Sequence, residues 1–538
     1  MTRSIRACLL ILVLAPLVFT QTAQKDEREL WLVRSQNITN DLLKDAGDLS
    51  SMQRAVLWVK LAQRWWREDP KRATTWIANA TETVEQVPNK ETPAEREERL
   101  ETARVLVTIV TPLDQKFTKR LLTVLTDKAT ENERFGNADA LIDGAVALVE
   151  EDPKRAAELA AIALRIAPAD NIDPLLFKLR RRDPQLADSL FVQALAAARQ
   201  DPKGKLLNSL MYVAFPAQRG VSGNIPVPPD SLRIELLQIY VTMITDSMVN
   251  DQKLTCGIVS WLAPLYSEFE RLVPKQWPVV RQGINQCQSA SPLVHQIIDD
   301  ATRSQPLNTV ESLLKAAADA KETDVRTVYK ARAAHLAKDG NDYELALKIL
   351  EDMTKEEREF MGESWDSFRW NWAADGAIDY YKSGRFREMN LLLDGVPSDW
   401  QPFAKAAFIT WLPENAVSET APIIQILNDA IKGLRRSTTI NASDKHNWYF
   451  GLLRPTVKYQ PLDANALLKD AIASLNQVKE AQPLNQTDWM RYLGASLVEM
   501  DEFVIKDALA SITPVPYRAQ LRLALLDATL KRANASRN

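Results

Sequence analysis

Few residues of this chain are of the types that commonly perform chemistry. The sequence contains three histidines, His295, His335 and His446, and they stand far apart. No His-x-x-x-His pair is present, so the zinc-binding helix of metallopeptidases is absent. The glycine patterns of phosphate and dinucleotide loops and the Gly-x-Ser-x-Gly turn of serine hydrolases are absent as well. We therefore expect no cofactor and no metal site, and the sequence favours a role other than catalysis.

Once the N-terminal residues are removed, two cysteines remain, Cys256 and Cys287. A pair of cysteines can do redox chemistry. They are too few for a structural zinc site. Midway between them, the segment RLVPKQW contains Pro274 and predicts a turn. An antiparallel hairpin folded at this turn brings both cysteines to the same height. An oxidising compartment closes such a pair into a disulfide. The alternative is two separate buried thiols, because cysteine is often buried.

Tryptophan is frequent in this sequence, with 14 residues. Trp365, Phe368 and Trp372 recur at the spacing of one helical face. Large indoles fill the space between stacked helices when each N–H finds a hydrogen-bond acceptor. The alternative is a groove in which exposed indoles bind sugars or peptides. For that role the candidate binding residues are Trp66, Trp365 and Trp370.

The N-terminus has the order of a secretory signal peptide. Arg3 and Arg6 precede thirteen apolar residues, and a polar segment follows them. The apolar run is shorter than the ~20 residues that span a bilayer. We expect a signal peptide at residues 1–23 and a mature protein that begins between Gln21 and Lys25. The protein is then exported, to the periplasm or outside the cell, and the mature chain has no transmembrane segment.

Composition bounds the fold and the class of partner. A chain of 538 residues exceeds one compact core, so two to four domains or an extended repeat array are expected. The 16 glycines are few, which favours helices over sheets rich in tight turns. With 67 basic and 70 acidic residues, the chain has no strong field that attracts nucleic acid.

A short motif, Asp-Pro, recurs where helices are expected to begin. It occurs at Asp69, Asp152, Asp183 and Asp201, each followed by proline. Aspartate caps a helix by accepting from free backbone N–H groups, and proline suits the first helical position. Apolar residues then follow at spacings of three and four, as in Ala156, Leu159, Ala160 and Leu164. Repetition of a helix start predicts stacked helical hairpins.

Two segments downstream share a second pattern. Leu336–Leu350 and Tyr380–Leu393 each read as a helix, a glycine turn, an aromatic residue and a second helix. Gly340 and Gly384 are expected to adopt the left-handed conformation that ends a helix. Ala377, Tyr380, Gly384 and Phe386 match the tetratricopeptide repeat, which this region resembles. The resemblance implies an all-α solenoid of stacked antiparallel helical hairpins.

The predicted domain organisation has two lobes. Residues 215–231 contain two glycines and four prolines and predict a long loop or hinge. The expected ranges are a signal peptide at 1–23, an N-terminal helical lobe at 24–214, the loop at 215–231 and a C-terminal helical lobe at 232–538. The hairpins that resemble tetratricopeptide repeats lie near 325–395.

Two functions are compatible with these patterns. The first is an exported helical-repeat scaffold, or a module that binds a protein or peptide, because solenoids expose long surfaces. The second is an α-helical toroid enzyme that acts on glycans or peptidoglycan. Glu363-Ser364 is similar to a dipeptide of lytic transglycosylases, but the glycine-containing segment that follows it in that family is absent. The oligomeric state stays open.

Overall fold

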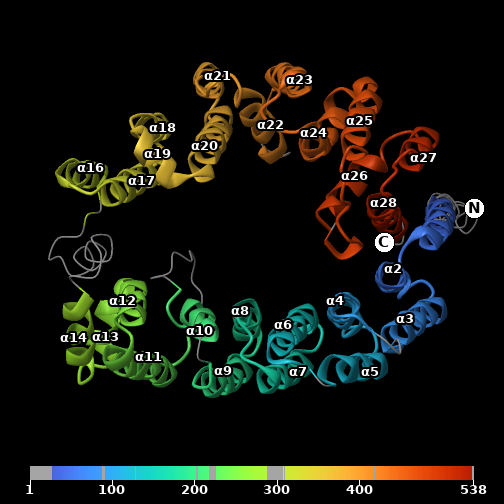
Figure 1. Cartoon of the computed structure of the whole chain (residues 1–538). Helices are drawn as coiled ribbons and strands as arrows, with labels where there is room; N and C mark the ends of the chain where they lie inside the picture. Colours follow the sequence, from blue (N-terminus) through green and yellow to red (C-terminus); the bar gives the residue numbers. More distant parts are fainter. Residues whose placement is uncertain are drawn as a thin grey trace, which may run out of the picture. The chain divides into compact units, whose positions relative to one another are not determined.

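The computed structural model describes residues 27–87, 91–127, 129–201, 204–216, 226–287, 307, 309–413, 415, 419–486 and 488–535. In this part of the chain the regular secondary structure is helical and contains no strand. Helices that follow one another in the sequence pack as pairs (Figure 1). The predicted all-α solenoid of stacked helical hairpins is therefore confirmed. The predicted signal peptide at 1–23 lies outside the described residues.

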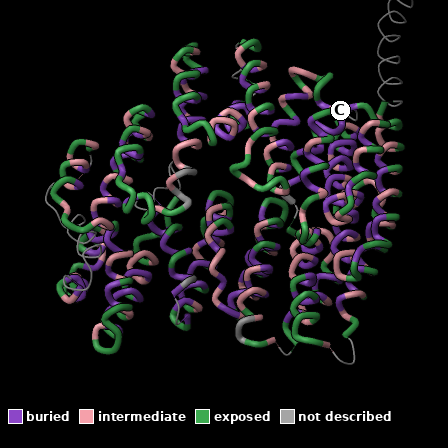
Figure 2. Tube along the Cα trace, turned by 45° about the horizontal axis from the view of Figure 1, so that its top comes forward, coloured by how far each residue is buried: buried purple, intermediate pink, exposed green. Residues whose placement is uncertain are grey.

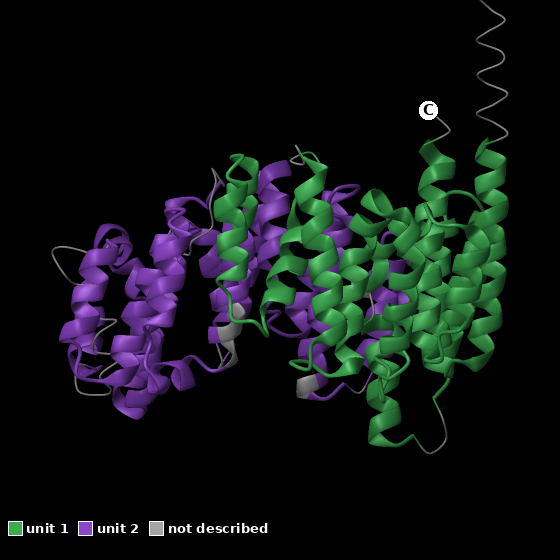
Figure 3. Ribbon diagram, turned by 90° about the horizontal axis from the view of Figure 1, so that it is seen from above, with its two compact units in different colours: residues 1–102, 377–538 green, residues 103–376 purple. Residues whose placement is uncertain are grey.

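The chain divides into two compact units (Figure 3). Unit 1 comprises Met1–Thr102 and Ala377–Asn538, and unit 2 comprises Ala103–Gly376. These limits do not coincide with the two predicted lobes, because helices from the two ends of the chain pack together and composition cannot reveal that pairing. Residues 217–225 of the predicted loop lie outside the described residues, so a hinge at 215–231 stays a prediction.

Unit 1 is built from helices of both ends of the chain, and two helices, α4 and α20, contain its limits. It begins with a helix that is described from residue 27 to residue 45. The others are η1 (Ala46–Asp48), α2 (Ser51–Trp65), α3 (Pro70–Glu85), α4 (Pro93–Val110), α20 (Glu363–Lys382), α21 (Phe386–Asp394), α22 (Gln401–Trp411), α23 (Thr420–Arg436), η5 (Ala442–Asp444), α24 (Lys445–Tyr459), α25 (Pro461–Leu475), η6 (Leu484–Gln486), η7 (Asp488–Leu493), α26 (Gly494–Leu497), α27 (Glu502–Ala510) and α28 (Val515–Ala535).

Unit 2 is a continuous stretch of the chain. Its helices between α4 and α20 are α5 (Gln115–Thr126), α6 (Glu131–Leu148), α7 (Pro153–Ile166), α8 (Asp173–Arg182), α9 (Pro184–Ala198), α10 (Lys205–Ala214), α11 (Asp230–Asn250), α12 (Gln252–Trp261), η3 (Ala263–Leu265), α13 (Tyr266–Leu272), α14 (Trp277–Cys287), α16 (Val310–Asp319), α17 (Thr323–Asp339), α18 (Tyr343–Glu351) and α19 (Lys355–Met361). None of the described helices of either unit is both long and apolar enough to cross a membrane.

Each helix buries one face against its neighbours. Buried and exposed residues alternate along the helices (Figure 2). In α7 the buried residues include the whole predicted stripe of Ala156, Leu159, Ala160 and Leu164. Alanine at these positions lets neighbouring helices approach closely, and the burial of apolar area is the main stabilising contribution.

Three of the four Asp-Pro motifs begin a helix as predicted. The carboxylates of Asp69, Asp152 and Asp183 cap α3, α7 and α9, and each accepts from the backbone N–H three residues later. The distances from Oδ1 to the nitrogen are 3.1, 3.1 and 3.0 Å. These bonds satisfy N–H groups that have no partner within the helix.

The prediction for Asp201-Pro202 was wrong, because α10 begins at Lys205. The residue before it, Gly204, has a positive φ of 63° and turns the chain out of the helical path. The carboxylate of Asp201 still accepts from the N–H of Leu206 at 3.1 Å, from further back in the sequence.

Replacing a capping aspartate should destabilise the fold without changing its binding. We expect Asp152→Ala to lower the free energy of unfolding by about 1 kcal/mol. Urea unfolding followed by circular dichroism measures this change. Glu158→Ala, an exposed position on the same helix, serves as the control and should leave the midpoint unchanged. Equal midpoints for Asp152→Ala and wild type would show that the carboxylate does not cap α7.

The two hairpins that resemble tetratricopeptide repeats are present as α17–α18 and α20–α21. In the second hairpin Gly384 has a φ of 72°, as predicted. In the first, Gly340 has a φ of −82° and Asn341 takes the left-handed conformation with a φ of 61°, which corrects the prediction for Gly340. Both turns then make the same bond, from the N–H that follows the left-handed residue to a carbonyl five residues earlier. Asparagine tolerates positive φ better than most residues, so Asn341 can take the position in the first turn that Gly384 takes in the second.

The two ends of the chain join within unit 1. The hydroxyl of Ser35 donates to Oγ1 of Thr529 at 2.9 Å, and Arg64 pairs with Asp527 at 2.6 Å. Asp45, at the end of the first helix, pairs with Arg518 and Arg522 of α28. Helices 27–45 and α28 therefore lie side by side near both ends of the chain (Figure 1).

Candidate functional site

The described histidines pack within the protein. Burial lowers the pKa of His335, an effect that Asp339 opposes and Lys338 reinforces. The His335 ring packs edge-on against Phe368 and Trp372, with centroids 5.3 and 4.7 Å apart. Burial likewise lowers the pKa of His446. Both imidazoles are therefore neutral at pH 7, as for residues that fill the space between helices, and His295 lies outside the described residues.

Several tryptophans fill the core, in line with the first of the two interpretations. Trp65, Trp76 and Trp372 are buried. The indole N–H of Trp65 donates to Oγ1 of Thr39 at 3.0 Å, which supplies the acceptor that a buried indole requires.

The three candidate binding tryptophans are half-buried and lie in different surroundings. Trp66 directly follows the last residue of α2, and Trp365 and Trp370 lie in α20. The guanidinium groups of Arg358 and Arg369 each lie over the Trp365 ring, 4.6 Å from its centroid. The indole N–H of Trp365 donates to the carbonyl of Leu350 at 3.1 Å. Trp66 belongs to unit 1 and Trp365 and Trp370 belong to unit 2, and a role of these residues in binding stays a prediction.

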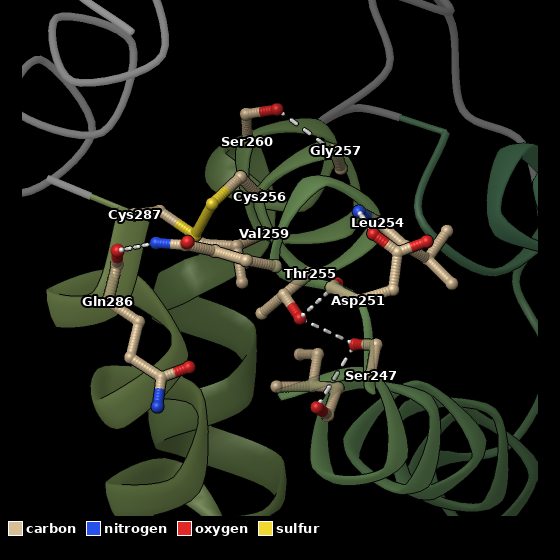
Figure 4. Close-up of a disulfide and its surroundings, with 12 residues drawn as sticks. Ser247, Asp251, Leu254, Thr255, Cys256, Gly257, Val259, Ser260, Gln286 and Cys287 are labelled. Atoms are coloured by element: carbon tan, nitrogen blue, oxygen red, sulfur yellow. Dashed lines mark hydrogen bonds between the residues drawn. A yellow bond between two sulfur atoms is a disulfide. The ribbon is translucent and has the colours of Figure 1, made fainter. Parts of the chain in front are cut away.

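Cys256 of α12 and Cys287 of α14 are joined by a disulfide, the pair that the sequence predicted (Figure 4). The hairpin between them is not two continuous helices, because α12 ends before Pro264 and a short 3-10 turn and α13 follow. Gly283 lets α14 lie close to its neighbours, since a Cβ there would stand 3.1 Å from Ile244 and 3.2 Å from Val259. Next to the disulfide, Gln252 donates to the carbonyl of Gln286 at 3.0 Å.

Removing the disulfide should destabilise unit 2. The bond closes a loop with a sequence separation of 31 residues. On the chain-entropy model, we expect the double variant Cys256→Ala/Cys287→Ala to have a free energy of unfolding that is lower by about 3–4 kcal/mol. Thermal unfolding of both proteins measures the loss, and peptide mapping of unreduced protein identifies the cross-linked pair. Recovery of both cysteines in alkylated form under denaturing, non-reducing conditions would contradict the bridge.

Unit 2 contains an acidic cavity beside α8 and α10. Its lining residues are Asp170, Asp173, Asn208, Ser209 and Tyr212. Burial raises the pKa of Asp173, against hydrogen bonds that lower it from its own backbone and from Ser209. A raised pKa lets a carboxyl group keep its proton to a higher pH than usual, which is the direction that a general acid requires.

A second cavity, in unit 1, is a groove between α25 and α27 with a volume of about 480 Å³. Its apolar lining comes from both helices, with Leu468 and Ile472 of α25 and Val504 and Ala508 of α27. At one end Asn476 ties the helices together, because its amide donates to the carbonyl of Ser511 at 3.0 Å and accepts from the N–H of Thr513 at 2.9 Å. The groove is therefore preformed and mostly apolar.

Two large apolar side chains are exposed at the other end of these helices. Leu462 is the second residue of α25 and is 94% exposed, and Phe503 is the second residue of α27 and is 80% exposed. Sequence reasoning missed both residues. Their only local signal is an apolar residue in the first turn of a helix, after Pro461 and after the capping Asp501. Their exposure, which the sequence does not show, makes them distinctive.

No metal centre is found among the described side chains, where no group of three or more histidine, cysteine, aspartate or glutamate residues could hold an ion.

The comparisons with known proteins do not assign a family. No family model matches the chain, and no curated protein matches it. A similar solved structure is described as a "circular tandem repeat protein with novel repeat topology and enhanced subunit contact surfaces". Its sequence is 12% identical, and the match covers 90% of this chain and 96% of that one with a TM-score of 0.17. At this level of structural agreement the match carries no argument about function.

Proposed function

We propose that the protein is an exported helical-repeat module that binds a peptide segment of a partner protein in the groove between α25 and α27. The observation that carries this proposal is a pair of exposed apolar residues, Leu462 and Phe503, in the first turns of the two helices that line a mostly apolar groove. Burial of a large side chain on binding contributes roughly 1.5–3 kcal/mol, so exposed aromatic residues beside a groove are typical anchors of recognition sites.

The lining of the groove defines the chemistry of its ligand. Leu468, Ile472, Val504 and Ala508 offer apolar contacts, while Asn465, Lys469 and Asp507 are polar residues of the rim. One lysine and one aspartate give the rim no net charge. The ligand that fits is therefore a segment with apolar side chains on one face and little net charge. A highly charged ligand would gain nothing from this surface.

Selection from a random peptide library displayed on phage tests the proposal, because the displayed segments are internal and have no free carboxyl terminus. The full-length mature protein is the bait. We expect enriched peptides with two apolar positions, and we expect Phe503→Ala and Leu462→Ala each to weaken their binding about tenfold. Phe360→Ala is the control, because Phe360 is 52% exposed in unit 2. Failure to enrich peptides, or equal effects of Phe503→Ala and Phe360→Ala, would contradict the proposal.

Export is part of the same proposal. The order of charged, apolar and polar residues at 1–23 supports it, and the disulfide between Cys256 and Cys287 suits an oxidising compartment. N-terminal sequencing of the protein from its native host tests it, with an expected start between Gln21 and Lys25. A start at Met1 would contradict export.

A second candidate function is hydrolysis of glycans or peptidoglycan at the acidic cavity of unit 2. Two carboxylates, Asp170 and Asp173, line it, and the raised pKa of Asp173 suits a general acid. Release of reducing ends from peptidoglycan measures this activity. Loss of the activity in Asp173→Asn would support the second candidate, and its absence from the wild-type protein would exclude it for this substrate.

A further inference from the structure

We propose that a second cavity of unit 1, on the opposite side of α27, binds the free carboxylate of a peptide C-terminus. This inference rests on the proposed binding of peptides and specifies a second part of the ligand. The cavity has a volume of about 320 Å³ and is lined by the helix at 27–45, α27 and α28. One face of α27, with Glu502, Ile505, Lys506 and Leu509, lines this cavity. The apolar groove is lined by the other face, with Val504, Asp507 and Ala508.

The charges of the lining residues favour an anion. Four are basic (Arg34, Lys44, Lys506 and Arg522), and two, Asp41 and Glu502, are acidic. Three of the basic residues have a carboxylate partner: Lys44 pairs with Asp41 at 3.0 Å, Arg522 pairs with Asp45, and Arg34 makes a longer contact of 3.4 Å with Glu502. Lys506, and Arg34 through the nitrogens that do not contact Glu502, are therefore the residues that can contribute positive charge to a ligand.

Arg34, which lines this cavity, has a buried hydrogen-bond donor without a partner. Its side chain is only 13% exposed, and its nearest carboxylate is that of Glu502, 3.4 Å from Nε. Its terminal nitrogen Nη2 is buried and has no hydrogen-bond partner. A buried donor without a partner is unfavourable, so an acceptor that reaches it stabilises the complex. A carboxylate is the natural acceptor, because its two oxygens match the geometry of the guanidinium group.

Arg34 differs in this respect from the other arginines of the described structure. Five others have a buried nitrogen without a partner, and in each it is Nε: Arg28, Arg64, Arg180, Arg233 and Arg369. Nε lies along the side chain, while Nη2 lies at its tip. None of these five lines the cavity that contains Arg34.

The floor of the cavity suits an apolar side chain next to the carboxylate. Ile38, Ile505, Leu509 and Leu525 line it and are buried. Such a floor favours a carboxylate attached to an aliphatic chain over a small inorganic anion. The amides of Asn37 and Asn40, which also line the cavity, can pair with a peptide backbone. The C-terminal residue of a peptide with an aliphatic side chain combines all three features.

The same chemistry, a carboxylate on an aliphatic chain, also occurs in free short-chain acids. Titration calorimetry on the full-length mature protein separates the two sources with three probes: an acetylated hexapeptide that ends in leucine, the same peptide as its C-terminal amide, and hexanoate. We expect the peptide acid to bind at least about tenfold more tightly than the amide, since the amide lacks the charge that pairs with Arg34. Equal binding of acid and amide would overturn the carboxylate site, and equal binding of hexanoate and peptide acid would overturn the peptide assignment.

Substitutions then assign the site to Arg34. Arg34→Gln should abolish the preference for the acid over the amide, while Arg28→Gln should keep it. Arg28 is the matched control because it lies on the same helix and pairs with Glu68, away from the cavity. Lys506→Glu, at an exposed position of the rim, should reduce the preference several-fold and covers the case in which Arg34→Gln does not fold. An unchanged preference in Lys506→Glu, or in a folded Arg34→Gln protein, would contradict the assignment.

The test of the carboxylate site does not depend on peptide binding in the apolar groove between α25 and α27. Phe503→Ala should leave the ratio of acid to amide affinity unchanged, because Phe503 does not line this cavity. A protein that selects no internal peptides but prefers the peptide acid would contradict the proposed groove and retain the carboxylate site. A protein that binds internal peptides but shows no preference for the acid would do the reverse.

Discussion

Asp45→Ala is expected to lower the free energy of unfolding of unit 1 by about 3–5 kcal/mol, the usual effect of removing one partner from a buried ion pair. The Asp45 side chain is 6% exposed, and its two oxygens accept from Arg518, at 2.9 Å, and from Arg522. The two guanidinium groups are 16% and 12% exposed, so water cannot fully replace the lost carboxylate. Urea unfolding measures the loss.

The same variant should loosen the contact between the two ends of the chain. Because Asp45 is in the first described helix and both arginines are in α28, limited proteolysis should release the N-terminal segment faster from Asp45→Ala than from wild type. Asp48→Ala is the control: Asp48 lies 3.4 Å from Arg518 but is 66% exposed, so its loss should cost less than about 1 kcal/mol. Equal destabilisation by the two substitutions would show that burial of Asp45 is unimportant.

Glu357→Ala is expected to have an effect of similar size in unit 2. Glu357 is fully buried, and its carboxylate accepts from Nε of Arg326 at 2.6 Å, from Nζ of Lys330 at 2.8 Å and from the N–H of Thr354 at 2.7 Å. Removing it leaves two largely buried cations without their partner, which should lower the free energy of unfolding by about 3–5 kcal/mol. Chemical denaturation at pH 7 measures the change, with the neighbouring exposed Glu356→Ala as the control.

The same carboxylate makes stability depend on pH. Burial alone would raise the pKa of Glu357, but hydrogen bonds from Lys330, the N–H of Thr354 and Arg326 outweigh it and hold the pKa below its ordinary 4.5. The folded state therefore binds this proton less readily than the unfolded chain. The contribution of Glu357 is complete above pH 4.5 and is lost as the pH falls from there through the lower pKa of the folded state.

Glu357→Gln should show a smaller loss of stability than wild type when the pH is lowered through that range. The comparison is made as the difference in unfolding midpoint between pH 7 and pH 4, because other carboxylates titrate in both proteins. Parallel pH profiles for Glu357→Gln and wild type would falsify the assignment of a lowered pKa to this residue.

Much of the local structure could be read from the sequence because its causes act over a few residues. A capping aspartate and the N–H that it binds are three positions apart, so Asp69, Asp152 and Asp183 could be recognised without knowledge of the fold. The helical period likewise marked the buried face of α7. The disulfide was within reach because a nearby turn relates Cys256 to Cys287.

The sites required the tertiary structure. Arg34 and α27 are separated by more than four hundred positions in the sequence, and nothing in either segment signals that they line one cavity. The candidate tryptophans were chosen by residue type, whereas exposure distinguishes Leu462 and Phe503, and exposure depends on which neighbours cover a side chain.

The sequence by itself determined that this is an all-α chain of stacked hairpins and that helices begin after Asp69, Asp152 and Asp183, and it favoured the pairing of Cys256 with Cys287. Only the tertiary structure decided that the two ends of the chain form one unit, that Asn341 rather than Gly340 makes the left-handed turn, and that a buried Arg34 lacks a partner for one nitrogen. The physical reason is the separation in the sequence between the residues that interact. Hydrogen bonds of caps and turns join residues a few positions apart, whereas Asp45 and its partners Arg518 and Arg522 meet only after the helices between them have packed.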